Sequence, residues 1–185
     1  MKAVLLSIQP KWCELIVSGK KTVEVRKNKP KLETPFKVYI YETQGRTETP
    51  FVDEEGHHIF KGRGQVIGEF TCDKIYDIKP HYDIPNFCNQ YEYGWKIGEA
   101  EDCLSFEELD FYLDGECGYG WHISDLKIYD KPKNKVEFCH PCDRDPQCDC
   151  RYCVRYAGNK PILRAPQSWC YVEQLQNEYS GGHNE

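Results

Sequence analysis

Three charged residues, of the kinds that bind anions and transfer protons, lie with a glycine in one eight-residue window near the start of the chain. The four residues are Gly19, Lys21, Glu24 and Arg26, and Trp12 comes shortly before them. An arginine can hold a phosphate through two hydrogen bonds or stack on a base, and a lysine adds a point charge. Glu24 can accept a hydrogen bond from a base amino group or hold Arg26 in place. This pattern favours a ligand site over its alternative, an exposed strip of ion pairs on an edge strand, which would contribute little stability.

The distribution of charge favours a short or small anionic ligand. The 185 residues carry a formal net charge of -6. A protein that covers a long nucleic acid must neutralise many phosphates at once, so duplex DNA is not an expected partner. Residues 1–37 nevertheless hold nine cationic residues and three glutamates, a net charge of +6, which leaves -12 for the remainder. A basic site on an acidic body fits a short RNA strand or a nucleotide.

The chain shows no sequence feature of a membrane or secreted protein. No run approaches the roughly eighteen apolar residues of a membrane span, and the N-terminus MKAVLLSIQP soon becomes charged and amphipathic. We therefore expect a cytoplasmic protein without a membrane partner, in which most of the eleven cysteines are reduced.

A second group of residues with metal-binding spacing lies near the C-terminus. The stretch CHPCDRDPQCDCRYC contains two CxxC pairs separated by seven residues. Each CxxC presents two thiolates from one tight turn, so the pattern indicates a structural zinc site. The alternative is a reduced Cys-rich loop without metal. The expected ligands are Cys139, Cys142, Cys150 and Cys153, with Cys148 and His140 as spare ligands.

The spacing of apolar residues places the charged window in a strand–helix–strand unit. Residues 2–8 are apolar enough for a buried strand. Pro10 suits the first turn of a short helix, and Gly19 can end that helix in a left-handed conformation. Residues 22–26 then alternate between apolar and polar side chains. The polar face of this second strand would present Thr22, Glu24 and Arg26.

The remainder of the chain predicts further strands and one more helix. A capping box from Ser105 to Glu108 opens a short helix that Gly115 ends. We expect a bulge at Gly68 and another near Asp125. The expected strands are residues 36–41, 65–78, 118–129 and 168–175. The expected connections are a polar loop at 43–64, an irregular insertion at 79–103 and a Cys-rich insertion at 131–159. Five or six strands with two short helices predict an α+β, mainly β fold, a partly open β-barrel.

The segment LSIQPKWCELIVSGKKTVEVRK resembles the ASCH domain family, whose fold is related to the PUA RNA-binding barrels. The family signature GxKxxExR is met by Gly19, Lys21, Glu24 and Arg26. The later segments GYGWHISDLKIYDKP and APQSWCYVE are similar to a phage-type and bacterial branch of this family. The resemblance implies a single PUA-like domain over residues 1–185, with a cleft beside the first helix that binds RNA or a nucleotide without a cofactor.

Within that cleft, ligand contacts are expected from the first strand, the first helix, the charged window and the GYGWH segment. Trp12 and Trp121 can equally be core residues, and packing against the sheet is the preferred interpretation for Trp12, whereas Ser7 and Gln9 can instead support the turn into the helix. Aromatic faces are the usual platforms for unpaired bases. The expected contact residues are Ser7, Gln9, Trp12, Gly19, Lys20, Lys21, Thr22, Glu24, Arg26, Trp121 and His122.

One branch of the family resembles small amidohydrolases that remove the acyl group from N4-acylated cytidine with a lysine, a threonine and a glutamate. Lys21 occupies the lysine position, but the threonine position is Glu24, so the nucleophile is missing. Lys21 and Glu24 would be catalytic only in such an enzyme, with Thr22 as a substitute hydroxyl. Binding is the preferred interpretation, the amidohydrolase is the first alternative, and a protein-interaction module that uses the Cys-rich loop is the second.

Overall fold

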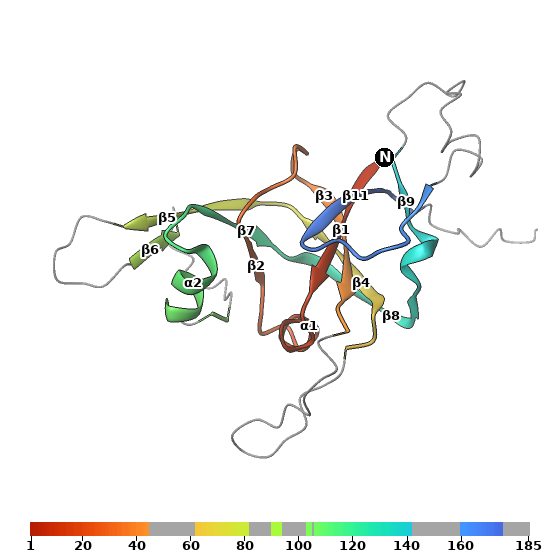
Figure 1. Ribbon diagram of the computed structural model, residues 1–185, viewed down its shortest axis with the longest axis horizontal. Coiled ribbons are helices and arrows are strands. Elements are labelled where there is room, and N and C mark those ends of the chain that lie inside the picture. Colours follow the sequence, from red (N-terminus) through yellow and green to blue (C-terminus); the bar gives the residue numbers. More distant parts are fainter. Residues whose placement is uncertain (45–61, 82–89, 94–102, 105, 142–159, 176–185) are drawn as a thin grey trace, which may run out of the picture.

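The computed structural model describes residues 1–44, 62–81, 90–93, 103–104, 106–141 and 160–175 (Figure 1). Within these residues the chain forms eleven strands, two α-helices and one 3-10 helix, η1 (Lys135–Glu137). The strands make three sheets, and no sheet closes into a barrel within the described part of the chain. The predicted α+β, mainly β fold is confirmed, although the described strands outnumber the five or six expected.

The larger sheet has five strands and contains most of the core. Its order is β11 (Trp169–Glu173), β1 (Lys2–Ile8), β3 (Phe36–Glu42), β4 (Gln65–Cys72) and β8 (Ser124–Lys133). The β1–β3 pair is parallel and the other pairs are antiparallel. Both faces of β1 are buried, because one set of its apolar side chains packs in each of two core clusters. This burial explains why the predicted strand 2–8 has no polar alternation.

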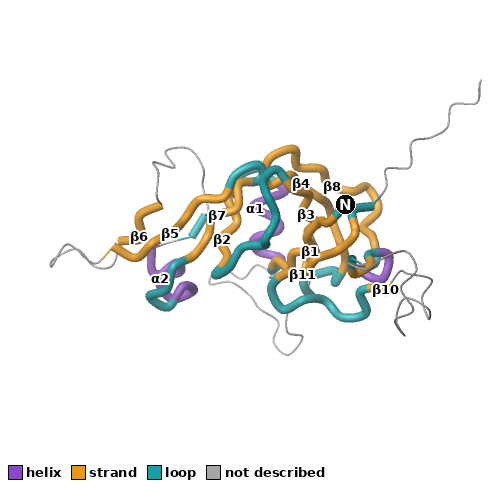
Figure 2. The backbone as a smooth tube through the Cα atoms, turned by 90° about the horizontal axis from the view of Figure 1, so that it is seen from above, coloured by secondary structure: helices purple, strands orange, loops and turns teal. Residues whose placement is uncertain are grey.

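The second sheet carries the charged window. Its order is β2 (Val23–Arg26), β7 (Gly118–His122), β5 (Ile75–His81) and β6 (Gln90–Tyr93), with antiparallel pairing throughout. The third sheet is a short pair between β9 (Cys139–His140) and β10 (Lys160–Pro161). Figure 2 shows the β2–β7–β5–β6 sheet extending to one side of the five-stranded sheet.

Two helices cover the two larger sheets. Helix α1 (Pro10–Val17) buries Cys13 and Ile16 in the core of the five-stranded sheet, and Gly19 follows at a φ of +73°. Helix α2 (Phe106–Leu113) packs Leu109 and Leu113 against Val25 and Ile78 of the four-stranded sheet. An ion pair of 3.1 Å between Lys11 Nζ and Glu108 Oε1 connects the helices. The predicted helix end at Gly115, with φ +73°, is confirmed, whereas Ser105 lies outside the described residues.

Two segments that were expected to be single long strands are each divided between the two sheets. The chain leaves the five-stranded sheet after Cys72 and enters the other at Ile75, and it returns at Ile123 between β7 and β8. The polar pair 73–74 and the left-handed Asp125, at φ +48°, allow these corners. The bulge expected at Gly68 is present as a register shift opposite Ile40 and Tyr41. These bends carry the chain from one sheet to the other.

Parts of the insertions expected at 79–103 and 131–159 form regular secondary structure. Strand β5 continues to His81 and β6 pairs with it, so part of the 79–103 segment belongs to the second sheet. Strand β8 extends to Lys133, and a capping box from Asn134 to Glu137 opens η1, which adds structure at the start of the 131–159 segment. Most of the 43–64 loop lies outside the described residues.

Candidate ligand-binding pocket

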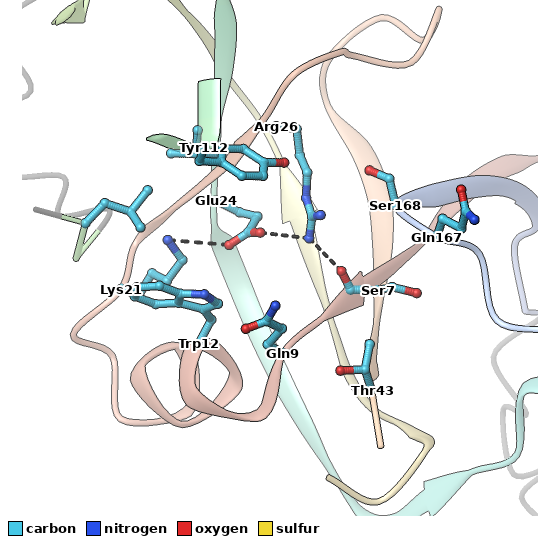
Figure 3. A pocket seen from close by; sticks show the side chains of 12 residues that line it. Ser7, Gln9, Trp12, Lys21, Glu24, Arg26, Thr43, Tyr112, Gln167 and Ser168 are labelled. Carbon is cyan, nitrogen blue, oxygen red and sulfur yellow. Dashed lines mark hydrogen bonds and ion pairs between the residues drawn. The ribbon is translucent and has the colours of Figure 1, made fainter. Parts of the chain in front are cut away.

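A pocket of about 370 Å³ lies where α1, β2 and α2 approach the start of β11 (Figure 3). This volume is within the range of sites for small organic ligands. The lining residues come from segments far apart in the chain. They are Ser7, Gln9, Trp12, Lys21, Glu24, Val25, Arg26, Thr43, Leu104, Tyr112, Gln167 and Ser168.

A buried row of three charges forms one wall of the pocket. Glu24 lies between two cations, with Oε2 3.4 Å from Lys21 Nζ and Oε1 2.8 Å from Arg26 Nη2. The three side chains are only 2%, 7% and 10% exposed for Lys21, Glu24 and Arg26. The exposed strip of ion pairs is therefore excluded, and the row carries one net positive charge away from water. Removing a partner from such a group is costly, because the remaining charge stays buried.

Arg26 is held in place by the first strand as well as by Glu24. Its Nη2 donates a hydrogen bond of 2.7 Å to the carbonyl oxygen of Ser7. Strand alternation places Glu24 and Arg26 on the same face of β2, as the sequence predicts, while Val25 points toward Leu109 and Leu113. Figure 3 shows the row running from Lys21 through Glu24 and Arg26 to Ser7.

Two polar atoms of this row form no hydrogen bond with any described residue. They are Glu24 Oε2, an acceptor whose nearest cation is an ion-pair contact at 3.4 Å, and Arg26 Nε, a donor. A buried polar atom without a hydrogen bond costs about 1–3 kcal/mol, and such atoms in a native protein call for a functional explanation. An acceptor and a donor on neighbouring side chains of a pocket can serve a ligand that has both kinds of group.

Aromatic side chains lie on either side of the charged row. Lys11 Nζ and Lys21 Nζ lie 4.4 Å and 5.1 Å from the ring centroid of Trp12, so cations already contact this ring. Tyr112 of α2 is partly exposed and lines the pocket beyond Glu24 in the view of Figure 3. The pocket therefore combines a local positive charge with two ring systems.

Ser7 and Gln9 have different roles in the wall beside α1. Ser7 is buried, and its Oγ donates a hydrogen bond of 2.6 Å to the carbonyl oxygen of Pro166. Gln9 is the N-cap residue of α1, but its side chain makes no capping hydrogen bond. The Gln9 amide therefore projects toward the pocket, whereas Ser7 joins β1 to the segment before β11.

Three of the expected contact residues lie in the turn between α1 and β2 and do not line the pocket. Gly19 provides the left-handed end of the helix. The carbonyl oxygen of Lys20 accepts a hydrogen bond from Cys103 Sγ, and that of Thr22 accepts one from Ile123 N. Thr22 is therefore absent from the pocket wall that contains Lys21.

Trp121 and His122 point to opposite faces of the sheet, because side chains alternate along β7. Trp121 pairs with Glu24 across the ladder but is fully buried, with its ring 5.8 Å from Phe36 and 6.1 Å from Trp169 between centroids. The next residue, His122, points the other way, where Nδ1 lies 2.6 Å from Asp73 Oδ1. Neither residue lines the pocket, contrary to expectation. Trp121 packs in the core, and His122 lies on the opposite face of the sheet.

Six lining residues were not expected from the sequence. Tyr112 fits the apolar face of a helix and is there indistinguishable from a core residue. Gln167 and Ser168 reach the pocket only because β11 pairs with β1. No spacing pattern in the chain marks the others, which are Val25, Thr43 and Leu104.

The expected zinc ligands lie mostly outside the described residues. Cys139 and His140 form β9, while Cys142, Cys148, Cys150 and Cys153 fall in the 142–159 segment. The described residues contain no group of three metal-binding side chains. The pairing of β9 with β10 brings the two ends of that segment together.

None of the helices in the described part of the chain has the length and apolar character needed to cross a membrane.

Comparisons with known proteins identify the family. The ASCH domain matches residues 6–110, and no curated protein matches the chain. The crystal structure of ASCH from Zymomonas mobilis is similar, with a TM-score of 0.53 and 21% identity over 93% of this chain and 88% of that chain. A tyrosine-to-phenylalanine mutant of that protein gives a TM-score of 0.52 and 20% identity, covering 94% and 92% of the two chains. These likenesses support the fold, and the domain match covers more than half of the chain, which therefore belongs to the ASCH domain family.

Proposed function

We propose that this protein binds RNA or a nucleotide in the pocket beside α1. The observation that carries the proposal is the buried row of Lys21, Glu24 and Arg26, which has one net positive charge and two polar atoms without hydrogen bonds from described residues. Membership of the ASCH family makes RNA binding plausible for this chain.

The chemistry of the row matches the two parts of a nucleotide. Arg26 and Lys21 can attract a phosphate, and Arg26 Nε can donate a hydrogen bond to it. Glu24 Oε2 can accept from a base amino group, as glutamate does with cytosine. Trp12 and Tyr112 offer ring faces for the base, and each base stacked on an aromatic side chain contributes about 1–3 kcal/mol.

The same geometry favours binding over hydrolysis. Lys21 Nζ lies 3.4 Å from the Glu24 carboxylate and 5.1 Å from the Trp12 ring centroid, so an ion pair and an aromatic ring already engage the amine that a hydrolase would use. The Ser7 hydroxyl is already engaged with Pro166, and Thr22 is not in the pocket wall. Turnover of N4-acetylcytidine that Lys21→Ala abolishes would replace the binding proposal with the amidohydrolase.

Tyr112 provides a test that leaves the buried charges in place. We expect Tyr112→Ala to weaken RNA binding by about 1–3 kcal/mol, roughly fivefold to 150-fold, because a stacking surface is lost. Phe111→Ala is the matched control, since Phe111 is the preceding residue of α2, is 89% exposed and does not line the pocket. Fluorescence anisotropy with a labelled 12-nucleotide RNA without self-complementarity measures both variants.

The indole N–H resonance of Trp12 provides the second readout. We expect the nucleoside monophosphates or the 12-nucleotide RNA to shift this NMR resonance, which Trp12→Phe assigns by its disappearance. For the mononucleotides, the indole of Trp121, which is fully buried outside the pocket, serves as the internal reference. If no probe shifts the Trp12 resonance, and Tyr112→Ala and Phe111→Ala bind RNA equally well, the proposed site is wrong.

We also propose, on the sequence pattern, that the two CxxC pairs hold a structural zinc ion. Four thiolates would complete a tetrahedral site and leave no open position for water, so the metal would have no catalytic role. The β9–β10 pairing is compatible with a compact clip, because it brings the ends of the intervening segment together.

A further inference from the structure

A row of lysines follows Arg26 in the sequence and extends away from the pocket. The loop that joins β2 to β3 begins KNKPK, with Lys27, Lys29 and Lys31 all exposed. This loop connects the two larger sheets, and Figure 2 shows it in teal. The lysines therefore occupy a bridge that starts at the charged row of the pocket.

The residues between these lysines anchor the loop. Asn28 Oδ1 accepts a hydrogen bond of 2.7 Å from Trp169 Nε1, Pro30 is buried, and Leu32 packs against the main core cluster. In addition, the backbone N–H of Lys31 donates a hydrogen bond of 2.7 Å to the Tyr171 hydroxyl. Alternate residues hold the loop against β11 and the core, so the lysine side chains emerge from a backbone that is already fixed.

Two of the three lysines in the row contact an aromatic ring through their ammonium groups. Lys27 Nζ lies 5.8 Å from the ring centroid of Tyr112, which lines the pocket, and Lys29 Nζ lies 4.6 Å from that of Tyr119. Tyr171, which binds the loop at Lys31, also has Lys2 Nζ 6.0 Å from its centroid. Lysines interleaved with aromatic faces form the kind of surface that binds the backbone and bases of a single strand.

The acidic groups near the row reduce its charge only in part. Lys29 Nζ lies 3.6 Å from Asp77 Oδ1, and both side chains are about half exposed, so this pair is weak. Glu33 follows the row in sequence. Because the chain as a whole has a net charge of -6, a cluster of three lysines in five residues is a local exception.

We propose that the lysine row, defined as Lys27, Lys29 and Lys31 with Tyr119 and Tyr171, binds the nucleotides that flank the one in the pocket. The ligand class is then single-stranded RNA of several nucleotides, and a free mononucleotide is only a partial ligand. This inference rests on the proposed function, since it needs the pocket to hold one nucleotide. Tyr112 belongs to both surfaces and makes the path from pocket to row continuous.

The salt dependence of binding measures the contribution of the row. For single strands, log K falls with log salt concentration by about 0.7 for each phosphate that the protein neutralises. The triple variant Lys27→Gln/Lys29→Gln/Lys31→Gln should reduce this slope by about 2 for the labelled 12-nucleotide RNA. At 0.1 M salt its affinity should fall roughly tenfold to 100-fold. The matched control is Lys127→Gln/Lys131→Gln/Lys135→Gln, which removes the same charge from β8 and η1, outside the pocket wall.

Two indole resonances separate this inference from the proposed function. A mononucleotide should shift Trp12 only, whereas the 12-nucleotide RNA should also shift Trp169, because Trp169 donates to Asn28 in the loop. In the triple variant the mononucleotide should still shift Trp12.

Four outcomes would contradict the lysine row or the pocket. If the triple variant and its control have the same salt slope, or RNA shifts Trp12 alone, the row is wrong and the pocket remains. Displacement of the RNA by poly-glutamate as effectively as by unlabelled RNA would make the row a general anion surface and overturn the inference. If neither probe shifts Trp12, and Tyr112→Ala and Phe111→Ala bind RNA equally well, the proposed function fails, and the row fails with it.

Discussion

Glu24→Gln tests whether water is excluded from the charged row of Lys21, Glu24 and Arg26, as the burial of these side chains indicates. The substitution keeps the shape of the side chain and removes the only negative charge among the three buried groups. Lys21 and Arg26 would then face each other across a neutral amide with two net positive charges in place of one.

The expected loss of stability follows from the burial of these groups. Breaking a buried ion pair by removing one partner costs about 3–5 kcal/mol, since the remaining charge loses its counter-ion without gaining water. A domain of this size unfolds with about 5–15 kcal/mol, so the change removes a large share of its stability. With a urea m-value of about 2 kcal/mol per molar, the midpoint of unfolding should fall by roughly 2 M.

Urea unfolding followed by tryptophan fluorescence measures the effect. Glu14→Gln is the matched control, because Glu14 is an exposed glutamate on α1 and should change the free energy of unfolding by less than about 0.5 kcal/mol. The double variant Lys21→Met/Glu24→Gln restores one net positive charge and should recover part of the loss, about 0.5–3 kcal/mol.

Equal stabilities of Glu24→Gln and Glu14→Gln would refute this reasoning. They would mean that water reaches the row in solution and that its charges are screened. Failure of Lys21→Met to improve the Glu24→Gln protein would likewise show that repulsion between the two cations is not the cause of the loss.

Three further predictions concern other parts of the molecule. Partial burial raises the pKa of the Glu69 carboxyl, but hydrogen bonds from Tyr129 and Lys37 lower it by more. The net result is a pKa below the ordinary value of a glutamate. The stability from this low pKa is present above the unfolded pKa of about 4.5 and is lost as pH falls through the folded pKa. Tyr129→Phe should therefore cost about 1.5–3 kcal/mol at pH 7 and less at pH 3 in urea unfolding, whereas a pH-independent loss would contradict the linkage. Burial raises the pKa of Cys72 to about 12, so iodoacetamide at pH 8 should modify exposed Cys117 far sooner, as mass spectrometry of digests can measure. Early labelling of Cys72 would show that the core opens. Protein purified without chelator should contain about one equivalent of zinc that Cys139→Ser/Cys142→Ser removes and Cys117→Ser keeps, and less than about a quarter equivalent would exclude the site.

The sequence by itself determined the parts of this protein that depend on neighbouring residues. The apolar run of β1, the proline and glycine limits of α1 and the two-residue period of β2 are local patterns, and each appears at the predicted place. They already place Glu24 and Arg26 on one face of a strand. The signature and its flanks also indicated the family, because they lie within the first strand–helix–strand unit.

Only the tertiary structure decided what surrounds that face. The Ser7 hydroxyl bonds to Pro166, 159 residues away, and this contact brings Gln167 and Ser168 to the pocket. Strand pairing buried Trp121 in the core and turned His122 to the opposite face. No local pattern encodes these contacts, because they depend on which distant strands meet and on which side chains fill the space between them. The burial that makes Lys21, Glu24 and Arg26 a dry, charged wall is the clearest case, since the same residues on an uncovered strand would be an ordinary exposed ion-pair strip.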